Sequence, residues 1–594
     1  MAEQGGMAEQ GSMARHEVTP SPSEASNEVM AVQPGYVRSL LGDRIAAAAV
    51  PERGVTFIVG DRAEKVSWSQ LFVDAIMMAD ALRARGVRPR DHVAILGPTT
   101  RTVVTAIEAT WLAGAVAVML PLPMRLGSVE EFVGQTRARI RNADAAIVLV
   151  DPDLAPFLDA CEGDPPLVTF EDVVVNAPTT ATTSVGVSSL DPDDLAILQF
   201  TSGSTAEPKG VMLPHSTVCA NLDAIVRGVD LLVGRDVAVS WLPLYHDMGL
   251  IGLLTVPMTT GIDLVLAGPQ DFLASPGRWL RWISDHRGTI TAGPNFSYAL
   301  AARAMTRMTE LDLSSWRVAL NGAEPVDPQN VDAFVRAGAS HGLDPRAVFC
   351  AFGMAEATLA VAFPEPLSGM RTDIVDRRVL ETDRYASAVS ETNDNARRFA
   401  ILGRPVDGLE LRIVDTDSGA VMGEREVGEL QISGASVTPG YFRRADATAA
   451  SFDGAWLRTG DLAYLVNGEL VVCGRMKDVI IVGGRNVWPE DIERSVATID
   501  GVRAGNVIAF GVEGRRGKEV IAVVAEVKAD DPETVRSSIA ERVRATIGIP
   551  AAWVVLVRPG SLPKTSSGKL QRSLCRERLL VGALELLEAP AVTS

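Results

Sequence analysis

A run of small and hydroxylated residues is the first segment whose composition suggests chemistry. It reads TSGSTAEPKG over residues 201–210 and follows the strand-like segment LAILQF. Backbone N–H groups and hydroxyls in such a loop can surround phosphate oxygens, and Lys209 adds a cation. The spacing differs from GxxxxGKS/T, which argues against a P-loop NTPase. The loop therefore predicts a phosphate site, and an ordinary Ser/Thr-rich turn is the alternative.

Further segments with chemically useful side chains follow this loop. They are SWLPLYHDMGLIG at 240–252, LNGAEPV at 320–326, AFGMAEAT at 351–358, WLRTGDLAYL at 456–465, CGRMKD at 473–478 and PKTSSGKLQR at 563–572. Glu356 with the hydroxyl of Thr205 could anchor Mg²⁺, which prefers hard oxygens and retains several waters. Lys569 lies in a glycine- and serine-rich stretch, where a lysine could swing into an anionic site. The order of the segments is much more specific than any one of them.

In this order, the segments resemble the adenylate-forming superfamily of acyl-CoA synthetases, adenylation domains and fatty-acyl-AMP ligases. The resemblance covers about residues 36–580. It implies that a carboxylate attacks the α-phosphate of ATP, with Mg²⁺ present. Because this step brings two anions together, the site must neutralise charge around the displacement.

The resemblance also implies roles for individual residues. Lys569 would bridge the carboxylate and the α-phosphate, and Lys477 would be the hinge of a mobile C-terminal domain. His246 would lie beside the substrate carboxylate and position it, because a carboxylate already ionised at pH 7 needs no general base. The expected nucleotide-binding residues are Thr201, Ser202, Gly203, Ser204, Thr205, Lys209, Gly322, Ala323, Glu324, Phe352, Gly353, Met354, Asp461, Arg475 and Lys569.

Three of these residues have more specific expected contacts. Phe352 would stack on adenine. The family more often has tyrosine at this position, and phenylalanine keeps the stacking but cannot make the phenolic hydrogen bond. Asp461 would accept the ribose hydroxyls, and Arg475 would reach the ribose or a phosphate.

Features around Glu356 favour the fatty-acyl-AMP ligase branch. Ala355 replaces the threonine that is usual in the synthetases, and Gly403 lies 47 positions after Glu356, roughly twice the expected separation. The excess resembles a ligase-specific insertion, at about residues 364–398, which in that family is thought to impede the use of CoA. Such ligases activate a fatty acid and pass it to the phosphopantetheine thiol of an acyl carrier protein or of a polyketide or nonribosomal synthase.

The wording of the motifs is most similar to the mycobactin-pathway ligases that lipidate a siderophore, so lipid or siderophore biosynthesis is the expected pathway. Two alternatives stay open. One is a fatty acyl-CoA synthetase of the same fold, and the other is a catalytically silent protein that binds a lipid or an adenylate.

The elements that must position these residues can be read from hydrophobic periodicity. Strand-like HVAILG, helix-like TVVTAIEATWLAG and strand-like AVAVMLPL and AAIVLVD alternate as in parallel βαβ units. From about Ile413, short strands with glycine turns predict a β-rich subdomain that ends near Gly474. We expect an α/β fold with a large N-terminal body over 34–476, a small mobile α+β domain over 477–594 and a disordered tail over 1–33. Caps and periodicity predict one helix, Pro532 to Ile547, after the N-cap Asp531.

Composition limits the remaining possibilities. The chain has 594 residues and a net charge of −18, which disfavours general nucleic-acid binding. Five scattered cysteines predict a reducing compartment, and the N-terminal stretch lacks the basic and apolar regions of a secretion signal. No apolar run approaches about 18 residues, so we expect no membrane-spanning helix. We expect a cytoplasmic monomer. Candidate contacts for an acidic partner are Arg515, Arg516, Lys518, Arg572, Arg576 and Arg578.

Overall fold

The computed structural model describes residues 39–122, 129–158, 161–175, 190–201, 208–514, 517–565 and 568–587. The predicted tail at 1–33 and residues 202–205 of the phosphate loop lie outside the described residues.

Two mostly parallel sheets form the large body of the molecule. One has the strand order β6-β5-β3-β4-β7-β8, and the other β13-β12-β11-β9-β10-β1-β2. The first contains β3 (His92–Leu96), β4 (Val116–Met119), β5 (Ala145–Val150), β6 (Leu167–Thr169), β7 (Leu195–Phe200) and β8 (Gly210–Pro214). The second contains β1 (Gly54–Val59), β2 (Arg62–Ser67), β9 (Val237–Ser240), β10 (Asp263–Ala267), β11 (Ile290–Pro294), β12 (Val318–Gly322) and β13 (Val348–Cys350).

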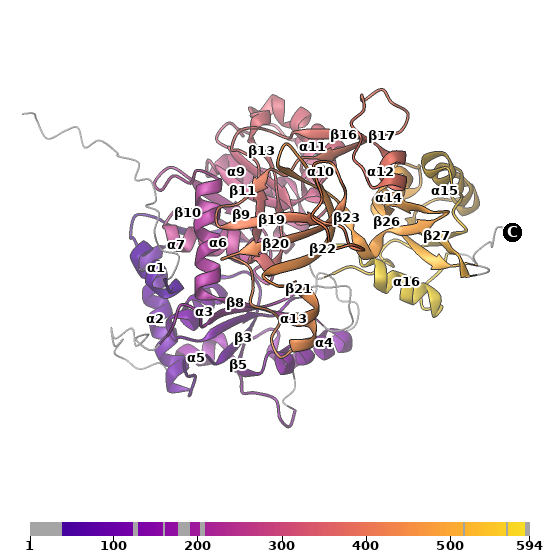
Figure 1. Cartoon of the computed structure of the whole chain (residues 1–594). Helices are drawn as coiled ribbons and strands as arrows, with labels where there is room; N and C mark the ends of the chain where they lie inside the picture. Colours follow the sequence, from indigo (N-terminus) through magenta and orange to yellow (C-terminus); the bar gives the residue numbers. More distant parts are fainter. Residues whose placement is uncertain are drawn as a thin grey trace, which may run out of the picture.

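Helices cover these sheets, which explains why the central strands are apolar along their whole length. Figure 1 shows α1, α2, α3 and α5 grouped around the N-terminal sheet, with α9, α10 and α11 in the other part of the large body. The parallel pairing of β3 with β4 and with β5 confirms the predicted βαβ units. The helices are α1 (Leu41–Ala48), α2 (Trp68–Ala84), α3 (Arg101–Leu112), α4 (Val129–Asn142), α5 (Phe170–Val175), α6 (His215–Gly228), α7 (Val256–Thr260), α8 (Pro269–Ala274), α9 (Gly277–Asp285), α10 (Asn295–Met305) and α11 (Pro328–Gly338).

The predicted β-rich part is an antiparallel sheet that follows the large parallel sheets. Its strands are β19 (Leu409–Val414), β20 (Gly428–Gly434), β21 (Phe452–Asp453), β22 (Trp456–Val466) and β23 (Glu469–Arg475). Smaller elements before it are β14 (Phe352–Gly353), β15 (Ala360–Phe363), β16 (Thr372–Asp376), α12 (Arg377–Asp383), β17 (Ala396–Ala400) and β18 (Arg404–Pro405), and α13 (Ala445–Ser451) precedes β21.

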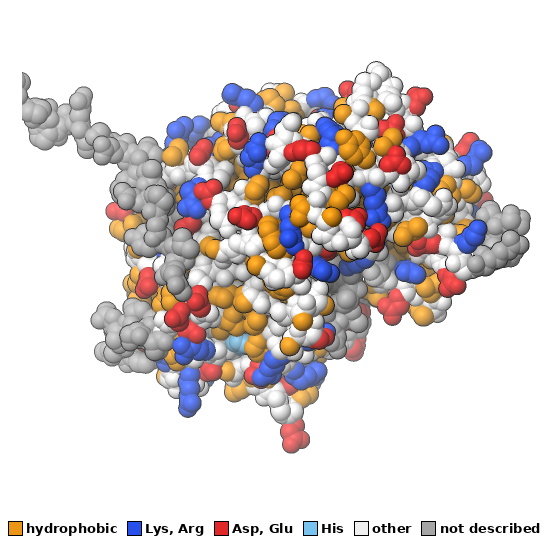
Figure 2. Space-filling model, in the orientation of Figure 1, with side chains coloured by type: hydrophobic (Ala, Val, Ile, Leu, Met, Phe, Trp, Pro, Cys, Tyr) orange, Lys and Arg blue, Asp and Glu red, His pale blue; other side chains and the backbone are white. Residues whose placement is uncertain are grey.

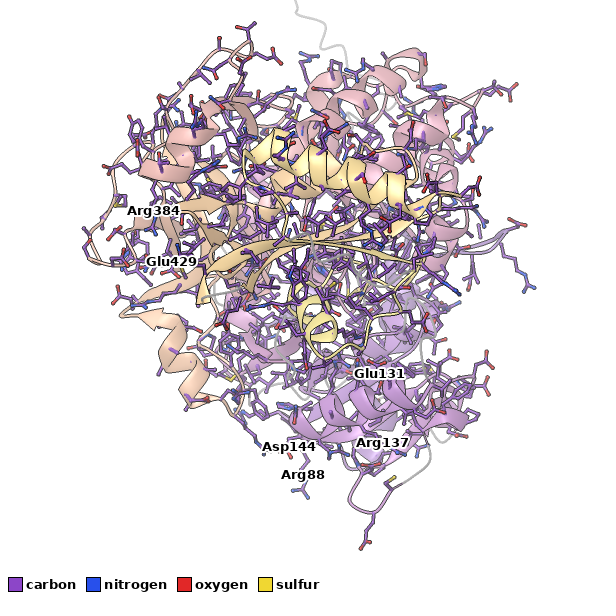
Figure 3. The ribbon with its side chains drawn as sticks, turned by 90° about the vertical axis from the view of Figure 1, so that its right-hand side faces the viewer. Arg88, Glu131, Arg137, Asp144, Arg384 and Glu429 are labelled. Carbon is purple, nitrogen blue, oxygen red and sulfur yellow. The ribbon has the colours of Figure 1, made fainter. Side chains whose placement is uncertain are left out.

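The C-terminal part has a three-stranded sheet with helices on opposite faces, as Figure 3 shows for α15 and α16. Alternate strand residues pack to the two sides: Val507 belongs to the apolar cluster of α15, and Ile508 to that of α16. The elements are β24 (Ile480–Val482), β25 (Arg485–Val487), α14 (Pro489–Val496), β26 (Val502–Glu513), β27 (Glu519–Val527), α15 (Pro532–Ile547), β28 (Trp553–Val557) and α16 (Arg572–Leu580).

The helix predicted from its caps is confirmed at both ends. α15 spans Pro532–Ile547, and the Asp531 side chain accepts a hydrogen bond from the Thr534 backbone N–H. Gly548 ends the helix with φ of 77°, in the left-handed region that glycine adopts readily.

Figure 2 shows acidic and basic side chains intermingled on the face in view. Across the described part of the chain, every helix falls short of the length and apolarity needed to cross a bilayer.

One buried acid in α3 makes a test of stability possible. Glu108 is 1% exposed, and neither carboxyl oxygen has a hydrogen-bond partner among the described residues. Burial, with a smaller contribution from Asp74, raises its pKa from 4.5 to about 8. Below pH 4.5 the Glu108 carboxyl is protonated in both the folded and the unfolded chain. Between pH 4.5 and about 8 it ionises in the unfolded chain first, so the free energy of unfolding falls as pH rises.

We therefore expect Glu108→Gln to gain stability relative to the wild type as pH rises, by roughly 3 kcal/mol between pH 4.5 and pH 7. Urea unfolding at several pH values measures this difference. A difference that does not change with pH would contradict the buried, protonated state of Glu108.

Candidate active site

The predicted site motifs follow four neighbouring parallel strands. β9, β11, β12 and β13 are adjacent in the seven-stranded sheet. The segment with His246 follows β9, Asn295 and Phe296 follow β11, Ala323 and Glu324 follow β12, and Phe352 comes after β13. Since the carboxyl ends of parallel strands share one edge, segments far apart in sequence meet there, at the usual ligand position of open α/β sheets.

The phosphate loop joins two antiparallel strands of the other sheet. Phe200 on β7 pairs with Gly210 on β8, and the Thr201 N–H donates to the Lys209 carbonyl at 3.1 Å. Thr201 and Lys209 thus close the base of the loop. Ser202, Gly203, Ser204 and Thr205 lie outside the described residues.

Glu356 is held by a tyrosine from a distant segment. The Tyr441 hydroxyl donates to Glu356 Oε1 at 3.0 Å, and Lys209 Nζ lies 4.6 Å from the centroid of the Tyr441 ring. Burial, followed by the charge of Glu356, raises the pKa of Tyr441, so this phenol stays a donor. Tyr441 therefore connects the phosphate loop to the predicted magnesium ligand.

The backbone around Glu356 is constrained by its neighbours. Thr358 adopts φ of 68°, which is strained for a β-branched residue, and its hydroxyl donates to the Ser436 carbonyl at 3.0 Å. A Cβ at Gly353 would lie 2.1 Å from the Leu359 carbonyl oxygen, which also accepts from the Met354 N–H. Only glycine fits at position 353, so this turn fixes where Phe352 and Glu356 lie.

Asp461 is a buried carboxylate with one free oxygen. Arg475 Nε lies 2.7 Å from Asp461 Oδ1, whereas Oδ2 has no hydrogen-bond partner among the described residues. Burial raises the Asp461 pKa to about 6, although Arg475 opposes the shift. An unpaired buried acceptor beside the site fits the predicted contact with ribose hydroxyls.

Lys569 lines a cavity with His246, although the two residues lie 323 positions apart in the sequence. The cavity, here called the head-group cavity, is lined by Trp241, Leu242, Pro243, His246, Met248, Pro269, Pro294, Ala323 and Lys569. The structure thus brings together three residues that the sequence predicted for the site, namely Lys569, His246 and Ala323.

Two acids compensate the charge of Lys569. Burial lowers the Lys569 pKa, while Asp247 and Glu324 act in the opposite direction. Burial alone would raise the pKa of Asp247, but His246 and Lys569 hold it below its ordinary value. His246 Nδ1 lies 2.5 Å from Asp247 Oδ1, and Glu324 Oε1 accepts from the Phe296 N–H at 2.7 Å. A ligand carboxylate would therefore enter a cavity whose lysine is already held by carboxylates.

Lys477 lies in the short turn Met476–Asp478 between β23 and the C-terminal elements. Burial lowers its pKa, and the charges of Asp478, Arg475, Asp461 and Lys209 act on it as well. Its neighbour Asp478 accepts from Arg572 Nη1 at 2.8 Å.

Arg572 is a correction to the sequence analysis. Instead of a free contact for an acidic partner, its guanidinium pairs with Asp478, Glu490 and Glu493, each at 2.8 Å. This cluster ties the segment that follows Lys569 to the turn that contains Lys477. Arg515 and Arg516 lie outside the described residues, whereas Lys518 and Arg576 are exposed.

Sequence reasoning missed Asp247 and Tyr441. Asp247 stands directly after His246, and a carboxylate next to a residue predicted to position the substrate was a usable signal. Tyr441 lies 85 positions from Glu356, and nothing local in its segment pointed to the site.

Known proteins resemble this chain along most of its length. The family described as AMP-binding enzyme matches residues 45–442. Rv1013 of Mycobacterium tuberculosis, named as a ligase, is 40% identical over 85% of this chain and 93% of its own. JamA of Moorena producens, named a medium-chain-fatty-acid–acyl-carrier-protein ligase, is 33% identical over 88% of this chain and 91% of its own.

A solved structure from a study of fatty acyl-adenylate ligases of E. coli and L. pneumophila superposes with a TM-score of 0.85. It is 33% identical and covers 91% of this chain and 98% of its own. Together with the α/β architecture described above, these similarities confirm the predicted adenylate-forming fold, and the chain belongs to the family of AMP-binding enzymes.

Proposed function

We propose that this enzyme activates a medium- or long-chain fatty acid with ATP and transfers the acyl group to the phosphopantetheine thiol of an acyl carrier protein. The observation that carries the proposal is the head-group cavity, where Lys569 faces a site built from His246 and Ala323. The names of JamA and of the solved fatty acyl-adenylate ligases support the choice of substrate.

In the first step, a carboxylate oxygen of the fatty acid attacks the α-phosphorus of ATP. A phosphorus–oxygen bond forms to give acyl-AMP, and the bond to the bridging oxygen breaks to release pyrophosphate. Lys569 neutralises the two converging anions, and His246 with Asp247 orients the carboxylate. Asp461 holds the ribose hydroxyls through its unpaired Oδ2, and Phe352 lies against adenine.

The residues present fit a magnesium ion bound mainly by phosphate and water. Among the described residues, no group of three or more acidic, histidine or cysteine side chains could enclose a metal. Glu356 with Thr205 would hold the ion, which suits Mg²⁺ because it retains several waters. When bound, Mg²⁺ supplies positive charge to the phosphates.

In the second step, the thiol sulfur attacks the acyl carbonyl, the carbon–oxygen bond to AMP breaks, and the thiol proton is lost. The rival acceptor is CoA. The predicted insertion at 364–398 supports a carrier protein as the acceptor, because the insertion contacts the C-terminal part. Figure 1 shows α12, which belongs to the insertion, beside α14 of the C-terminal part.

Buried charges form this docking contact. Arg485 Nε donates to Glu381 Oε2 at 2.9 Å, and Arg397 Nε lies 3.0 Å from Asp491 Oδ1. Glu381 is fully buried, and its other basic neighbour, Arg377, lies 4.0 Å away, so removal of Arg485 would leave its charge poorly compensated. Contacts of this kind would hold the C-terminal domain in arrangements in which CoA does not act as the acyl acceptor.

Incubation of the enzyme with ATP, dodecanoic acid and either CoA or phosphopantetheinylated carrier protein tests the proposal. We expect acyl-AMP and pyrophosphate in both mixtures but an acyl thioester only on the carrier. Acyl-CoA formed at a comparable rate would identify a CoA synthetase, and absence of any adenylate would identify a silent binding protein.

The same assay tests the insertion. We expect Arg485→Met to raise acyl-CoA formation at least about tenfold, because the Glu381 contact is lost, whereas Arg378→Met on the exposed face of α12 leaves it unchanged. Equal acyl-CoA rates in Arg485→Met and the wild type would remove the insertion from its proposed role.

We further propose a cytoplasmic monomer that serves lipid or mycobactin-like siderophore biosynthesis. The free state of all five cysteines, four of them buried, supports a reducing compartment. The resemblance of the motifs supports the pathway.

A further inference from the structure

Arg572 joins the segment that carries Lys569 to other elements of the C-terminal part. Its guanidinium lies 2.8 Å from a carboxylate oxygen of each of Asp478, Glu490 and Glu493, and its Nε also donates to Glu493 Oε1 at 3.0 Å. These four side chains, here called the Arg572 cluster, are each at most 19% exposed. Because charge-assisted pairs of this kind are strong and specific in geometry, the cluster fixes three chain segments relative to one another.

Lys569 lies three positions before Arg572, on one side of a hairpin that leads into α16. The Gln571 N–H donates to the Pro563 carbonyl at 3.0 Å, and the Thr565 N–H donates to the Lys569 carbonyl at 2.8 Å. Arg572 is the first residue of α16. Backbone hydrogen bonds thus hold the chain on both sides of this short stretch, so a displacement of the guanidinium is transmitted to the lysine.

The cluster also reaches the turn that contains Lys477, the predicted hinge. Asp478 follows Lys477 directly and is the last residue of that turn. Glu493, on α14, accepts in addition from the Ala509 N–H of β26 at 3.0 Å. The turn, α14 and β26 are thereby connected, so a rotation about the hinge would carry Lys569 along as part of one rigid body.

We propose that Arg572 is a positioning residue for the first step, because it couples the turn that contains Lys477 to the hairpin of Lys569. Closure of the C-terminal domain then places the ammonium between the fatty acid carboxylate and the α-phosphate. This inference rests on the proposed function. Arginine suits the role because its planar guanidinium offers several donors in a fixed arrangement, whereas a lysine in its place is a point charge on a flexible stem.

Single-turnover pyrophosphate release with ATP and dodecanoic acid tests this role. A misplacement of about 1 Å can cost about 100-fold in rate, so we expect Arg572→Lys to slow release at least about tenfold and Asp478→Asn at least about threefold. The ATP concentration that gives half the maximal rate should stay the same, since Asp461 and Phe352 belong to the large body. Arg544→Lys, at an exposed arginine of α15, is the matched control and should react like the wild type.

The same two substitutions in a Lys569→Ala background show whether the effect passes through the lysine. We expect Arg572→Lys and Asp478→Asn to change the residual rate of Lys569→Ala by less than about twofold, because a lysine that is absent cannot be misplaced. A merely structural role would lower the rate by the same factor with and without Lys569. Equal factors in the two backgrounds, or wild-type rates in both single variants, would overturn the inference.

The outcomes separate this inference from the proposed function. If the wild type releases no pyrophosphate with a fatty acid, the proposed function fails, and the inference fails with it. If the wild type is active and Lys569→Ala is slow, equal factors in the two backgrounds overturn the inference alone. Thermal unfolding shows whether each variant is folded. Asp478→Asn leaves Glu490 and Glu493 in place, so the test stays decisive if Arg572→Lys does not fold.

Discussion

Replacement of Lys569 with alanine is expected to slow acyl-adenylate formation by about 10²- to 10³-fold. The lysine lines the head-group cavity, and it is the one lysine or arginine among the described lining residues. Its loss would leave the carboxylate and the α-phosphate to repel each other during attack. Single-turnover measurement of pyrophosphate release gives the rate.

ATP binding separates this effect from damage to the nucleotide site. Since Asp461 and Phe352 lie on other elements, calorimetry should show nearly unchanged ATP affinity in Lys569→Ala. Lys528→Ala, at an exposed lysine of the same C-terminal part, is the matched control and should react like the wild type. Unchanged pyrophosphate release in Lys569→Ala would remove Lys569 from the first step.

Local signals in the sequence were sufficient for individual elements. α15 could be predicted at both ends because its N-cap, first-turn proline, apolar face and terminal glycine all lie within one short segment. The strands β3, β4 and β5 were recognisable because strands buried on both faces are continuously apolar. In these cases residues close in sequence determine the conformation.

Contacts between distant segments could not be predicted from local sequence patterns. Arg572 looked like a surface cation, yet three carboxylates from other elements surround it. Tyr441 reaches Glu356 only because the chain returns past β8, where the Phe442 N–H donates to the Gly210 carbonyl. The docking of Arg397 on Asp491 and over the Trp488 ring likewise depends on how two distant parts of the chain meet.

The second large effect is expected at Asp461, where alanine should weaken ATP binding by about 100-fold. Hydrogen bonds from the ribose hydroxyls to the unpaired Oδ2 of this carboxylate are charge-assisted and worth about 1.5–3 kcal/mol each, and alanine removes this acceptor. Calorimetric titration with ATP measures the change. Asp453→Ala, at an exposed acid of β21, is the control and should bind ATP like the wild type.

The pH dependence provides a sharper test of the same residue. The Asp461 pKa of about 6 means that the carboxylate is mostly ionised at pH 7 and progressively protonated below pH 6. Because the ionised form is the better acceptor, wild-type ATP affinity should fall by up to about tenfold per pH unit below pH 6.

The phosphates of ATP also titrate, so the informative quantity is the difference in ATP affinity between the wild type and Asp461→Asn. This difference should shrink as pH falls, since a protonated aspartic acid and an asparagine are both neutral. Parallel profiles from pH 5 to pH 8 would show that the ionised Asp461 does not bind the nucleotide.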